Sequence, residues 1–337
     1  MNRRVTVVGG GLAGSEAAWQ LARRGIEVLL LEMRPLRTTP AHTTEMLAEV
    51  VCSNSFGADG AASPAGILKN ELRRLDSLIL SCADESRVPA GKALAVDREI
   101  FSQKVTERLE SLPQVAVRRE ECVSLPEGPV IVATGPLTSP ALAAILQRQA
   151  GTEYLSFFDA VAPVVVADSI DMSVAFRRGR WGQEEDYINC PFTRERYEAF
   201  WNALVSAERA LPHDFEDSPS WFEGCLPVEV MASRGIDTLR FGPLRPVGLP
   251  LPGTGEEAWA VVQLRQDNRE GTLFNLVGFQ TSLRWGEQER VFRMIPGLEN
   301  AEFARLGVMH RNIYVNAPAT LDKRLRFREG RTDLFLA

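Results

Sequence analysis

The 337-residue sequence has little of what metal sites and membrane proteins usually contain. It has three histidines and five cysteines, and no two cysteines form a CxxC pair. Structural zinc sites use closely spaced ligands, so no metal is expected. Scattered cysteines are typical of free thiols in a reducing compartment. No segment approaches the roughly 20 apolar residues of a membrane span, and the first residues lack the apolar run of a signal peptide, so we expect a cytoplasmic protein with no membrane contact.

An excess of positive charge is also absent. The formal net charge is −6, which excludes a protein coated in basic residues. Contact with a nucleic acid would therefore need a local basic patch. Two arginine-rich segments are candidates for such a patch, but a solvated charged face explains them equally well. The residues concerned are Arg177, Arg178, Arg180, Lys323, Arg324, Arg326, Arg328 and Arg331.

The strongest local pattern is a glycine-rich turn near the start of the sequence. An apolar run at 5–8 precedes a GxGxxG turn, and an alanine-rich segment with helical spacing leads to a second apolar run that ends at Glu32. This order predicts the opening of a doubly wound α/β domain that binds a dinucleotide. Backbone N–H groups would hold the pyrophosphate, and Glu32 would accept hydrogen bonds from ribose hydroxyls. The turn residues assigned to this site are Gly9, Gly11, Leu12, Ala13 and Gly14.

Glu32 narrows the choice of dinucleotide. A carboxylate here disfavours a ribose with a 2′-phosphate, so FAD or NAD fits better than NADP. A later segment, "VIVATGP" at 130–136, is expected to be another short buried strand. Together with the turn and Glu32, this segment resembles the two-site flavoproteins, in which the later glycine turn passes near FAD. The resemblance implies FAD, with Thr134 and Gly135 as further contacts.

The rest of the chain is less regular. Leucine spacing predicts helices over 66–80 and 97–111, and a long loop precedes the first of them. From about residue 154 strand-like and turn-rich segments alternate, with a helix over 194–211 and further strand-like segments over 228–280. These features predict a mixed α+β insertion into the first domain.

The expected architecture is therefore a Rossmann-like FAD-binding domain interrupted by an insertion domain. We assign residues 1–160 to the first part of the FAD-binding domain and 161–324 to the insertion. Residues 325–337 are expected to begin the return to the FAD-binding domain.

Several long strings carry a more specific resemblance. They are "LLLEMRP", "VVCSNSF" at 50–56, "EGCLPVEVMASRGIDTLRFGPLRPVGL" at 223–249, "FNLVGFQTSLRWGEQERVF" at 274–292 and "GVMHRN" at 307–312. With these strings the sequence closely resembles the bacterial folate- and FAD-dependent tRNA (uracil-5-)-methyltransferases, from the first predicted strand to the last residue. Strings of this length are far more specific than a glycine pattern.

The resemblance implies a reaction and its cofactors. A one-carbon unit passes from 5,10-methylenetetrahydrofolate to C5 of a T-loop uridine in tRNA, reduced FAD acts as relay and reductant, and NAD(P)H reduces the flavin. Cys52 and Cys225 fall in the two cysteine strings. A thiolate is suited to add to C6 of uracil, because it is nucleophilic and can leave again. We assign that role to Cys225, and assign Cys52 to proton removal from C5 or to protection of a flavin-bound methylene.

Other roles are less specific. His310 and Arg284 lie in matching strings and are candidate substrate contacts, although a histidine that only satisfies the core is an equal alternative. We expect Cys82, Cys122 and Cys190 to be buried, inert thiols. The glutamates on either side of Cys225 would raise the pKa of its thiol unless arginines such as Arg234, Arg240 or Arg245 offset them.

Two alternatives to the tRNA enzyme stay open at this point. One is a related enzyme that methylates a uridine of ribosomal RNA, and the other is a flavin-free remnant that binds RNA or a protein partner. The chain ends in "RTDLFLA", which we expect to be a buried strand. Family members continue past this point into a second glycine-rich turn, so we expect the sequence to be truncated at its C-terminus. A plain NAD-dependent oxidoreductase is disfavoured by the two cysteine strings.

Overall fold

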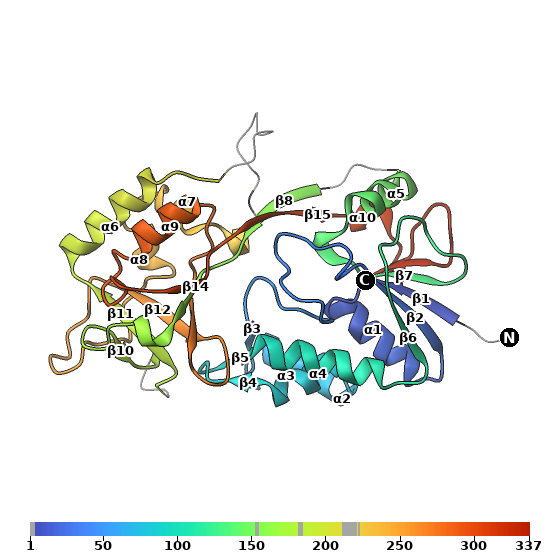
Figure 1. The fold of residues 1–337 in the computed structure, drawn as a ribbon, viewed down its shortest axis with the longest axis horizontal. Helices are drawn as coiled ribbons and strands as arrows, with labels where there is room; N and C mark the ends of the chain where they lie inside the picture. Colours follow the sequence, from blue (N-terminus) through green and yellow to red (C-terminus); the bar gives the residue numbers. More distant parts are fainter. Residues whose placement is uncertain (1–3, 152–154, 181–184, 211–220, 222) are drawn as a thin grey trace.

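The computed structural model has two lobes joined by a pair of long strands (Figure 1). It describes residues 4–151, 155–180, 185–210, 221 and 223–337. Each lobe is built around its own sheet, one of five strands and one of six.

The first lobe contains a fully parallel five-stranded sheet in the order β16-β7-β1-β2-β6. Apolar β-branched residues fill its central strands, as expected for a sheet covered on both faces. Val7, Leu30, Val130 and Val132 are almost fully buried. The strands are β1 (Arg4–Val8), β2 (Glu27–Glu32), β6 (Val115–Arg119), β7 (Val130–Val132) and β16 (Leu334–Leu336).

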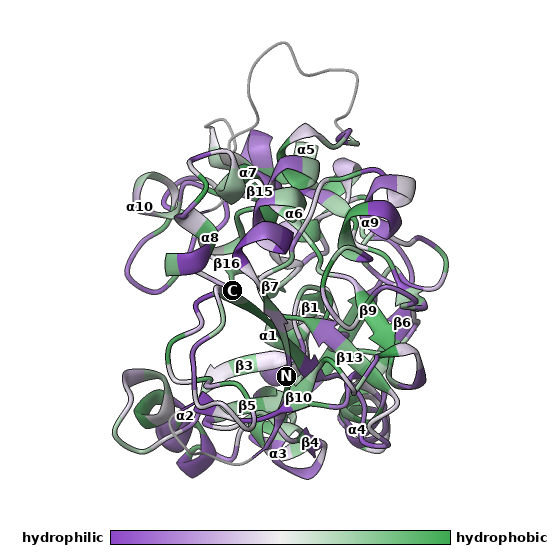
Figure 2. Cartoon of the chain, turned by 90° about the vertical axis from the view of Figure 1, so that its left-hand side faces the viewer, coloured by the Kyte–Doolittle hydropathy of each residue, from purple (hydrophilic) through white to green (hydrophobic). Residues whose placement is uncertain are grey.

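Helices cover both faces of this sheet (Figure 1). One face packs against α1 (Leu12–Ala22), α3 (Leu78–Glu85) and α4 (Arg98–Glu110), and the other against α5 (Pro140–Ala150). Helices on both faces of a parallel sheet confirm the doubly wound α/β prediction. Figure 2 shows the inner strand β7 in the hydrophobic colour.

One predicted helix is two helices. The segment predicted over 66–80 contains α2 (Pro64–Arg74) and the start of α3. Asp76 between them has φ +55°, and the Ser77 side chain accepts a hydrogen bond from the N–H of Leu80, which begins a new helix. The leucine pattern continued across this break, so periodicity alone missed it. The helix predicted over 97–111 is confirmed as α4.

The second lobe contains a six-stranded sheet in the order β10-β11-β12-β13-β9-β14. Its core is rich in aromatic side chains, among them Phe192, Phe200, Phe279 and Phe292, whose rings contact one another in sequence. The strands are β10 (Phe176–Arg177), β11 (Tyr187–Phe192), β12 (Ala260–Gln266), β13 (Leu273–Leu276), β9 (Val164–Val166) and β14 (Phe303–Arg305).

Helices α6 (Arg194–Ser206), α7 (Val228–Ala232), α8 (Thr238–Phe241) and α9 (Trp285–Phe292) pack against this lobe. The helix predicted over 194–211 matches α6 up to Ser206, and residue 211 lies outside the described residues. The prediction of strand-like segments over 228–280 is wrong for its first part, because α7 and α8 are helical. Their apolar residues pack into the aromatic core from one side.

Two strands connect the lobes. β8 (Leu155–Ala160) pairs antiparallel with β15 (Met309–Tyr314), with Asp159 opposite His310. A smaller sheet of β3 (Ser55–Ala58), β5 (Ala93–Val96) and β4 (Arg87–Val88) lies at the base of the first lobe, and α10 (Ala317–Thr320) precedes β16. The six-stranded sheet falls between Val164 and Arg305, inside the range proposed for the insertion; the boundaries at 160 and 324 stay a prediction.

No helix among the described residues combines the length and apolar character that crossing a bilayer requires.

Candidate functional site

In the glycine turn between β1 and α1, the backbone at the start of the helix lies close to the backbone at the end of the strand. Gly9 has φ +100°, which favours glycine, and a Cβ on Gly14 would lie 1.8 Å from the carbonyl oxygen of Gly9. A Cβ on Gly11 would meet no atom within 4 Å, so this residue borders open space. No side chain caps α1, which leaves its first N–H groups, at Leu12 and Ala13, available to an anion.

Glu32 ends β2 and is almost fully buried beside this turn. Its Oε2 accepts a hydrogen bond from the N–H of Gly10 at 2.8 Å, and its Oε1 accepts from the backbone N–H and Nε of Arg34 at 3.0 and 2.9 Å. Burial alone would raise the pKa of Glu32, but these contacts and the Arg34 charge lower it below the usual value. Each carboxylate oxygen can accept about two hydrogen bonds, so Oε2 keeps capacity for one more donor.

A pocket connects the turn to the other predicted contacts. Gly9, Gly11, Glu32 and Thr134 all line it. Gly135, with φ +60°, follows in a short 3-10 helix, η1 (Gly135–Leu137), and borders a neighbouring pocket. The predicted cofactor residues thus gather at the carboxyl ends of β1, β2 and β7, where doubly wound sheets bind ligands.

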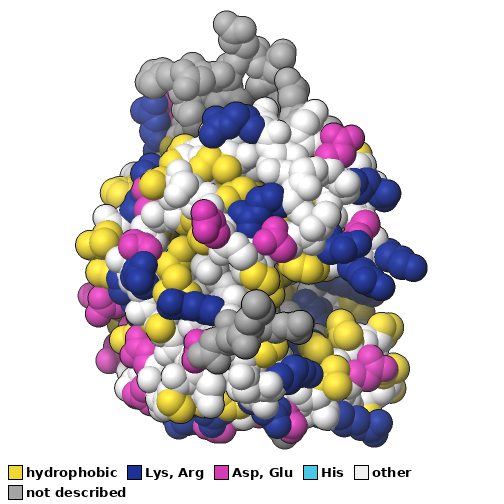
Figure 3. Space-filling view, turned by 90° about the vertical axis from the view of Figure 1, so that its right-hand side faces the viewer, with side chains coloured by type: hydrophobic (Ala, Val, Ile, Leu, Met, Phe, Trp, Pro, Cys, Tyr) yellow, Lys and Arg dark blue, Asp and Glu magenta, His cyan; other side chains and the backbone are white. Residues whose placement is uncertain are grey.

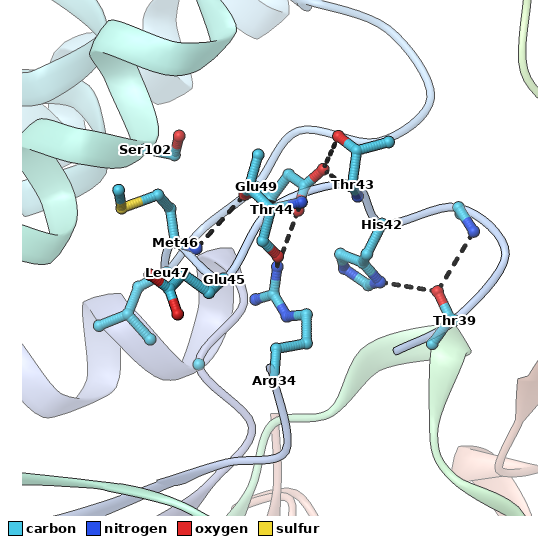
Figure 4. A network of polar contacts seen from close by, with 12 residues as sticks. Arg34, Thr39, His42, Thr43, Thr44, Glu45, Met46, Leu47, Glu49 and Ser102 are labelled. Atoms are coloured by element: carbon cyan, nitrogen blue, oxygen red, sulfur yellow. Dashed lines mark hydrogen bonds and ion pairs between the residues drawn. The ribbon is translucent and has the colours of Figure 1, made fainter. Parts of the chain in front are cut away.

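Arg34 and Glu49 organise the long loop that follows β2 (Figure 4). Arg34 is almost fully buried and bridges Glu32 to Glu49, with its NH1 2.9 Å from Glu49 Oε2. Glu49 also accepts hydrogen bonds from the N–H and hydroxyl groups of Thr43 and Thr44. Sequence reasoning did not single out Arg34 or Glu49; the run of threonines before a glutamate was the signal available.

This loop delivers Cys52 to the junction of the lobes. The next two residues are fixed to the second lobe, since Asn54 Nδ2 donates to the carbonyl of Gln266 at 2.9 Å and Arg265 donates to Asn54 Oδ1 and Ser53 Oγ. Cys52 is half-buried, with its Sγ 3.8 Å from the carbonyl oxygen of Ala160.

Cys225 ends a short 3-10 helix, η4 (Glu223–Cys225), just before α7. It is half-buried. The helix α7 is anchored by Glu229, whose carboxylate accepts hydrogen bonds from the hydroxyl of Thr281 and from the N–H and hydroxyl of Ser282. This anchor fixes the segment that carries Cys225.

The two glutamates flanking Cys225 have partners of their own. Glu223 forms an ion pair with Arg234 at 2.8 Å, and Arg234 is one of the arginines expected to offset the glutamate charges. Glu229 accepts hydrogen bonds from Thr281 and Ser282. The carboxylate that acts on Cys225 is Asp159 of β8. The sequence could not show this, because Asp159 lies far from Cys225 along the chain.

Cys52, Cys225 and Asp159 form a compact cluster. The two sulfur atoms and a carboxylate oxygen of Asp159 all lie within 4.8 Å of one another. A hydrogen bond from Cys225 lowers the pKa of Cys52 in spite of burial, and the charges of Arg98 and Arg305 act in the same direction. The same hydrogen bond, with burial and Asp159, raises the pKa of Cys225. Of the two thiols, Cys52 is therefore the one that loses its proton more readily.

Arg98 and Arg305 place guanidinium groups at this junction, and some of their N–H donors have no hydrogen-bond partner among the described residues. Arg98 pairs with Asp267 at 3.1 Å, but its NH2 is buried without a hydrogen-bond partner among the described residues. The Nε and NH2 of Arg305 are in the same state, and both arginines line one cavity of about 340 Å³. Buried guanidinium nitrogens without partners are costly, so this cavity suits an anionic group of a ligand.

The two tentative substrate residues differ in their surroundings. His310 on β15 is 6% exposed, and its Nδ1 has no partner among the described residues. Burial lowers the pKa of His310, so the ring is neutral near pH 7. Arg284 is exposed at the start of α9 and pairs with Glu208 at 2.9 Å.

Several of the arginines predicted as possible RNA contacts form hydrogen bonds or ion pairs within the chain. Arg180 donates to the carbonyls of Val247 and Arg245, Arg326 pairs with Asp322, and Arg331 pairs with Asp333. Lys323, Arg324 and Arg328 are exposed. On the face shown in Figure 3, basic side chains alternate with acidic and apolar ones.

Comparison with known proteins gives one consistent family. The family model described as "Glucose inhibited division protein A" matches residues 4–337. The chain is 61% identical to a protein of Moorella thermoacetica over all of this chain and 77% of that protein. It is 60% identical to one of Thermosynechococcus vestitus (97% and 72% covered) and 54% identical to one of Listeria monocytogenes (100% and 77% covered). All three relatives are named methylenetetrahydrofolate--tRNA-(uracil-5-)-methyltransferase TrmFO.

Among solved structures, GidA of Aquifex aeolicus superposes with a TM-score of 0.68 at 18% identity, over all of this chain and 59% of that one. This likeness supports the fold. The chain belongs to the glucose inhibited division protein A family and, within it, to the methylenetetrahydrofolate--tRNA-(uracil-5-)-methyltransferases.

Proposed function

We propose that this chain is a flavin-dependent methyltransferase that modifies C5 of a T-loop uridine in tRNA, with 5,10-methylenetetrahydrofolate as the one-carbon donor. The names of relatives 54–61% identical to it support this function. The observation that carries the proposal is the meeting of Cys52 and Cys225, whose sulfurs come within 4.8 Å from opposite lobes. Two neighbouring thiols, one of them with a lowered pKa, suit the nucleophilic and proton-transfer steps of this reaction.

The first lobe fits FAD as the cofactor. The open space at Gly11 and the uncapped N-terminus of α1 would receive the pyrophosphate, and Glu32 Oε2 can accept a ribose hydroxyl. When bound, reduced FAD would relay the one-carbon unit and supply the electrons that reduce it to a methyl group. NAD(P)H would be the source of those electrons.

Cys225 is the nucleophile in this proposal. C5 of uracil reacts poorly with electrophiles until a nucleophile adds to C6 and makes C5 part of an enolate. The Cys225 sulfur forms the bond to C6, and its proton passes to the deprotonated form of Cys52, whose sulfur lies within 4.8 Å. The pair thus supplies both a nucleophile and an acceptor for its proton.

Cys52 is the base for C5. The proton that Cys52 receives from Cys225 passes to solvent, to which this half-buried side chain is partly exposed. Once C5 carries the new carbon, Cys52 takes the proton from C5, and the Cys225–C6 bond breaks to restore the ring. Arg98 and Arg305 favour the thiolate form of Cys52 through their charge.

The proposed partner, tRNA, also implies a cytoplasmic location. A net charge of −6 leaves no general attraction for RNA, so contact depends on local basic groups such as Lys323, Arg324 and Arg328.

Covalent trapping on tRNA that contains 5-fluorouridine tests this assignment. Fluorine at C5 cannot leave as a proton, so the enzyme should remain bonded to C6. The native chain and a Cys82→Ala variant, altered at a thiol fully buried in α3, should both form the adduct, whereas Cys225→Ala should form none. An adduct of undiminished yield in Cys225→Ala would show that another residue is the nucleophile.

A further inference from the structure

The cysteine cluster has a chemical capacity that the methyl-transfer reaction does not use. Two sulfur ligands and one carboxylate oxygen form a donor set typical of zinc. We propose that Cys52, Cys225 and Asp159 form a binding site for Zn²⁺, and that occupation of this site blocks both thiols.

The distances fit a single ion. Zn–S and Zn–O bonds of about 2.3 and 2.1 Å place two donors of one tetrahedral zinc roughly 3.5 Å apart. The donor atoms of the cluster already lie within 4.8 Å of one another. Small side-chain rotations are sufficient to bring all three onto one ion, and three protein ligands leave a fourth position open.

The residue proposed for that position is His310, whose ring nitrogens lie outside the 4.8 Å cluster and would have to move toward it. His310 lies directly opposite Asp159 across the β8–β15 pair, so the two side chains are on the same face of the strands. It is 6% exposed, and its Nδ1 is buried without a partner among the described residues. A buried imidazole nitrogen without a partner is the donor that zinc takes in Cys- and His-containing sites.

The surroundings of Asp159 resemble those of a metal ligand. Its Oδ1 accepts a hydrogen bond from the N–H of Ala160 at 2.8 Å, and its Oδ2 faces Asn312 Nδ2 at 3.4 Å. Such outer contacts orient a carboxylate that binds a metal. Asp159 is also largely buried, which limits competition from water.

The charges balance within the site. Two thiolates, one carboxylate and Zn²⁺ give a net charge of −1, and any proton still carried by either sulfur is released to solvent on binding. Arg98 and Arg305 act electrostatically on Cys52 and offset the remaining negative charge. No oxidant or reductant takes part in this binding.

The consequence for activity rests on the proposed function. With both sulfurs coordinated, zinc withdraws their negative charge, so Cys225 becomes a weaker nucleophile toward C6 and Cys52 a weaker base for the proton on C5. Zinc should therefore inhibit methylation reversibly, and a chelator should restore it.

Titration with Co²⁺, a spectroscopic substitute for zinc, tests the site without an activity assay. The holoprotein, reduced with a phosphine that does not bind metals, should give a sulfur-to-cobalt charge-transfer band in the difference spectrum that saturates at one equivalent and disappears on addition of Zn²⁺. Cys52→Ala and Cys225→Ala should each lose most of the band, and Asp159→Asn should weaken binding roughly 10- to 100-fold. Cys82→Ala is the matched control and should bind as the native chain does. A band that persists in Cys52→Ala or Cys225→Ala, or no band at all in the native chain, overturns the proposal.

The activity assay separates this inference from the function on which it rests. Cobalt binding at the cysteines in a protein that methylates no tRNA would retain the metal site and reject the proposed function. Methylation without cobalt binding, and without inhibition by zinc, would retain the function and reject the site.

Discussion

Cys52 and Cys225 have neighbouring sulfurs but opposite electrostatic surroundings. The charge of Asp159 raises the pKa of both thiols, whereas the charges of Arg98 and Arg305 lower the pKa of Cys52. A hydrogen bond from one sulfur to the other increases the difference, because it stabilises a negative charge on Cys52. The pKa of Cys52 is therefore lowered and that of Cys225 raised before any substrate binds, as the proposed roles of base and nucleophile require.

This division predicts how the two thiols react with iodoacetamide. The thiolate is the reactive form, so Cys52, with its pKa below the ordinary 9.0, should be alkylated at lower pH than Cys225. In Cys225→Ala the hydrogen bond is lost, the pKa of Cys52 rises, and its alkylation should move to higher pH. Mass spectrometry of the two peptides across a pH series measures both profiles. An unchanged Cys52 profile in the variant would mean that the sulfur–sulfur hydrogen bond does not control its pKa.

A second prediction at the residue scale concerns the contribution of Glu32 to the stability of the fold and to FAD binding. Its pKa lies below 4.5 in the folded chain, so its contribution to stability is present above that value and is lost as the pH falls through the folded pKa. Glu32→Ala should lower the free energy of unfolding by about 2 kcal/mol, because the Gly10 N–H loses its acceptor and Arg34 loses one of its two carboxylates. The variant should also retain less FAD. Retention equal to the native chain, measured by flavin absorbance after gel filtration, would contradict the placement of the ribose.

At the scale of elements, α7 depends on one buried carboxylate. Glu229 is fully buried and accepts three hydrogen bonds from Thr281 and Ser282, in the segment between β13 and α9. Glu229→Ala should destabilise the chain by about 3 kcal/mol, since it leaves these donors unsatisfied, and should slow covalent trapping by displacing Cys225. Glu223→Ala, on the other side of Cys225, removes an exposed ion pair and should change little. Urea unfolding of both variants compares the two; equal effects would reject the anchor.

The elements also show what the sequence could predict. The sequence predicted β1, α1 and β2 because an apolar run, a glycine turn, a helical spacing and a second apolar run follow one another within one short segment. It also predicted β7, because a short apolar run is followed there by a glycine. The gathering of Gly9, Glu32 and Thr134 around one pocket follows from the parallel order of these strands.

The cysteine cluster was predictable only in part. The resemblance selected Cys52 and Cys225, but Asp159 sits in an ordinary strand-like string and enters the site through the pairing of β8 with β15. Arg34 and Glu49 were missed for a similar reason, because their importance arises from a loop that folds back on itself. Contacts between distant segments leave no periodic signal in the sequence.

At the scale of the whole molecule, polar contacts fix the position of one lobe relative to the other. Arg98 in the first lobe pairs with Asp267 in the second, and Asp97 accepts a hydrogen bond from the N–H of Arg269. Asn54 and Arg265 add a further connection next to Cys52. Because Cys52 comes from one lobe and Cys225 from the other, their separation depends on these contacts.

Loosening the lobes should therefore separate the thiols. Asp267→Asn removes the charge that holds Arg98, so the mean distance between the Cys52 and Cys225 sulfurs should increase and vary more. Dibromobimane, which fluoresces strongly only after bridging two nearby thiols, should label the native chain efficiently and Asp267→Asn several times more slowly. Asp76→Asn is the matched control, because it breaks an exposed pair with Arg23 inside the first lobe. Equal labelling of the native chain and both variants would show that the buried Arg98–Asp267 pair has no part in bringing the two cysteines together.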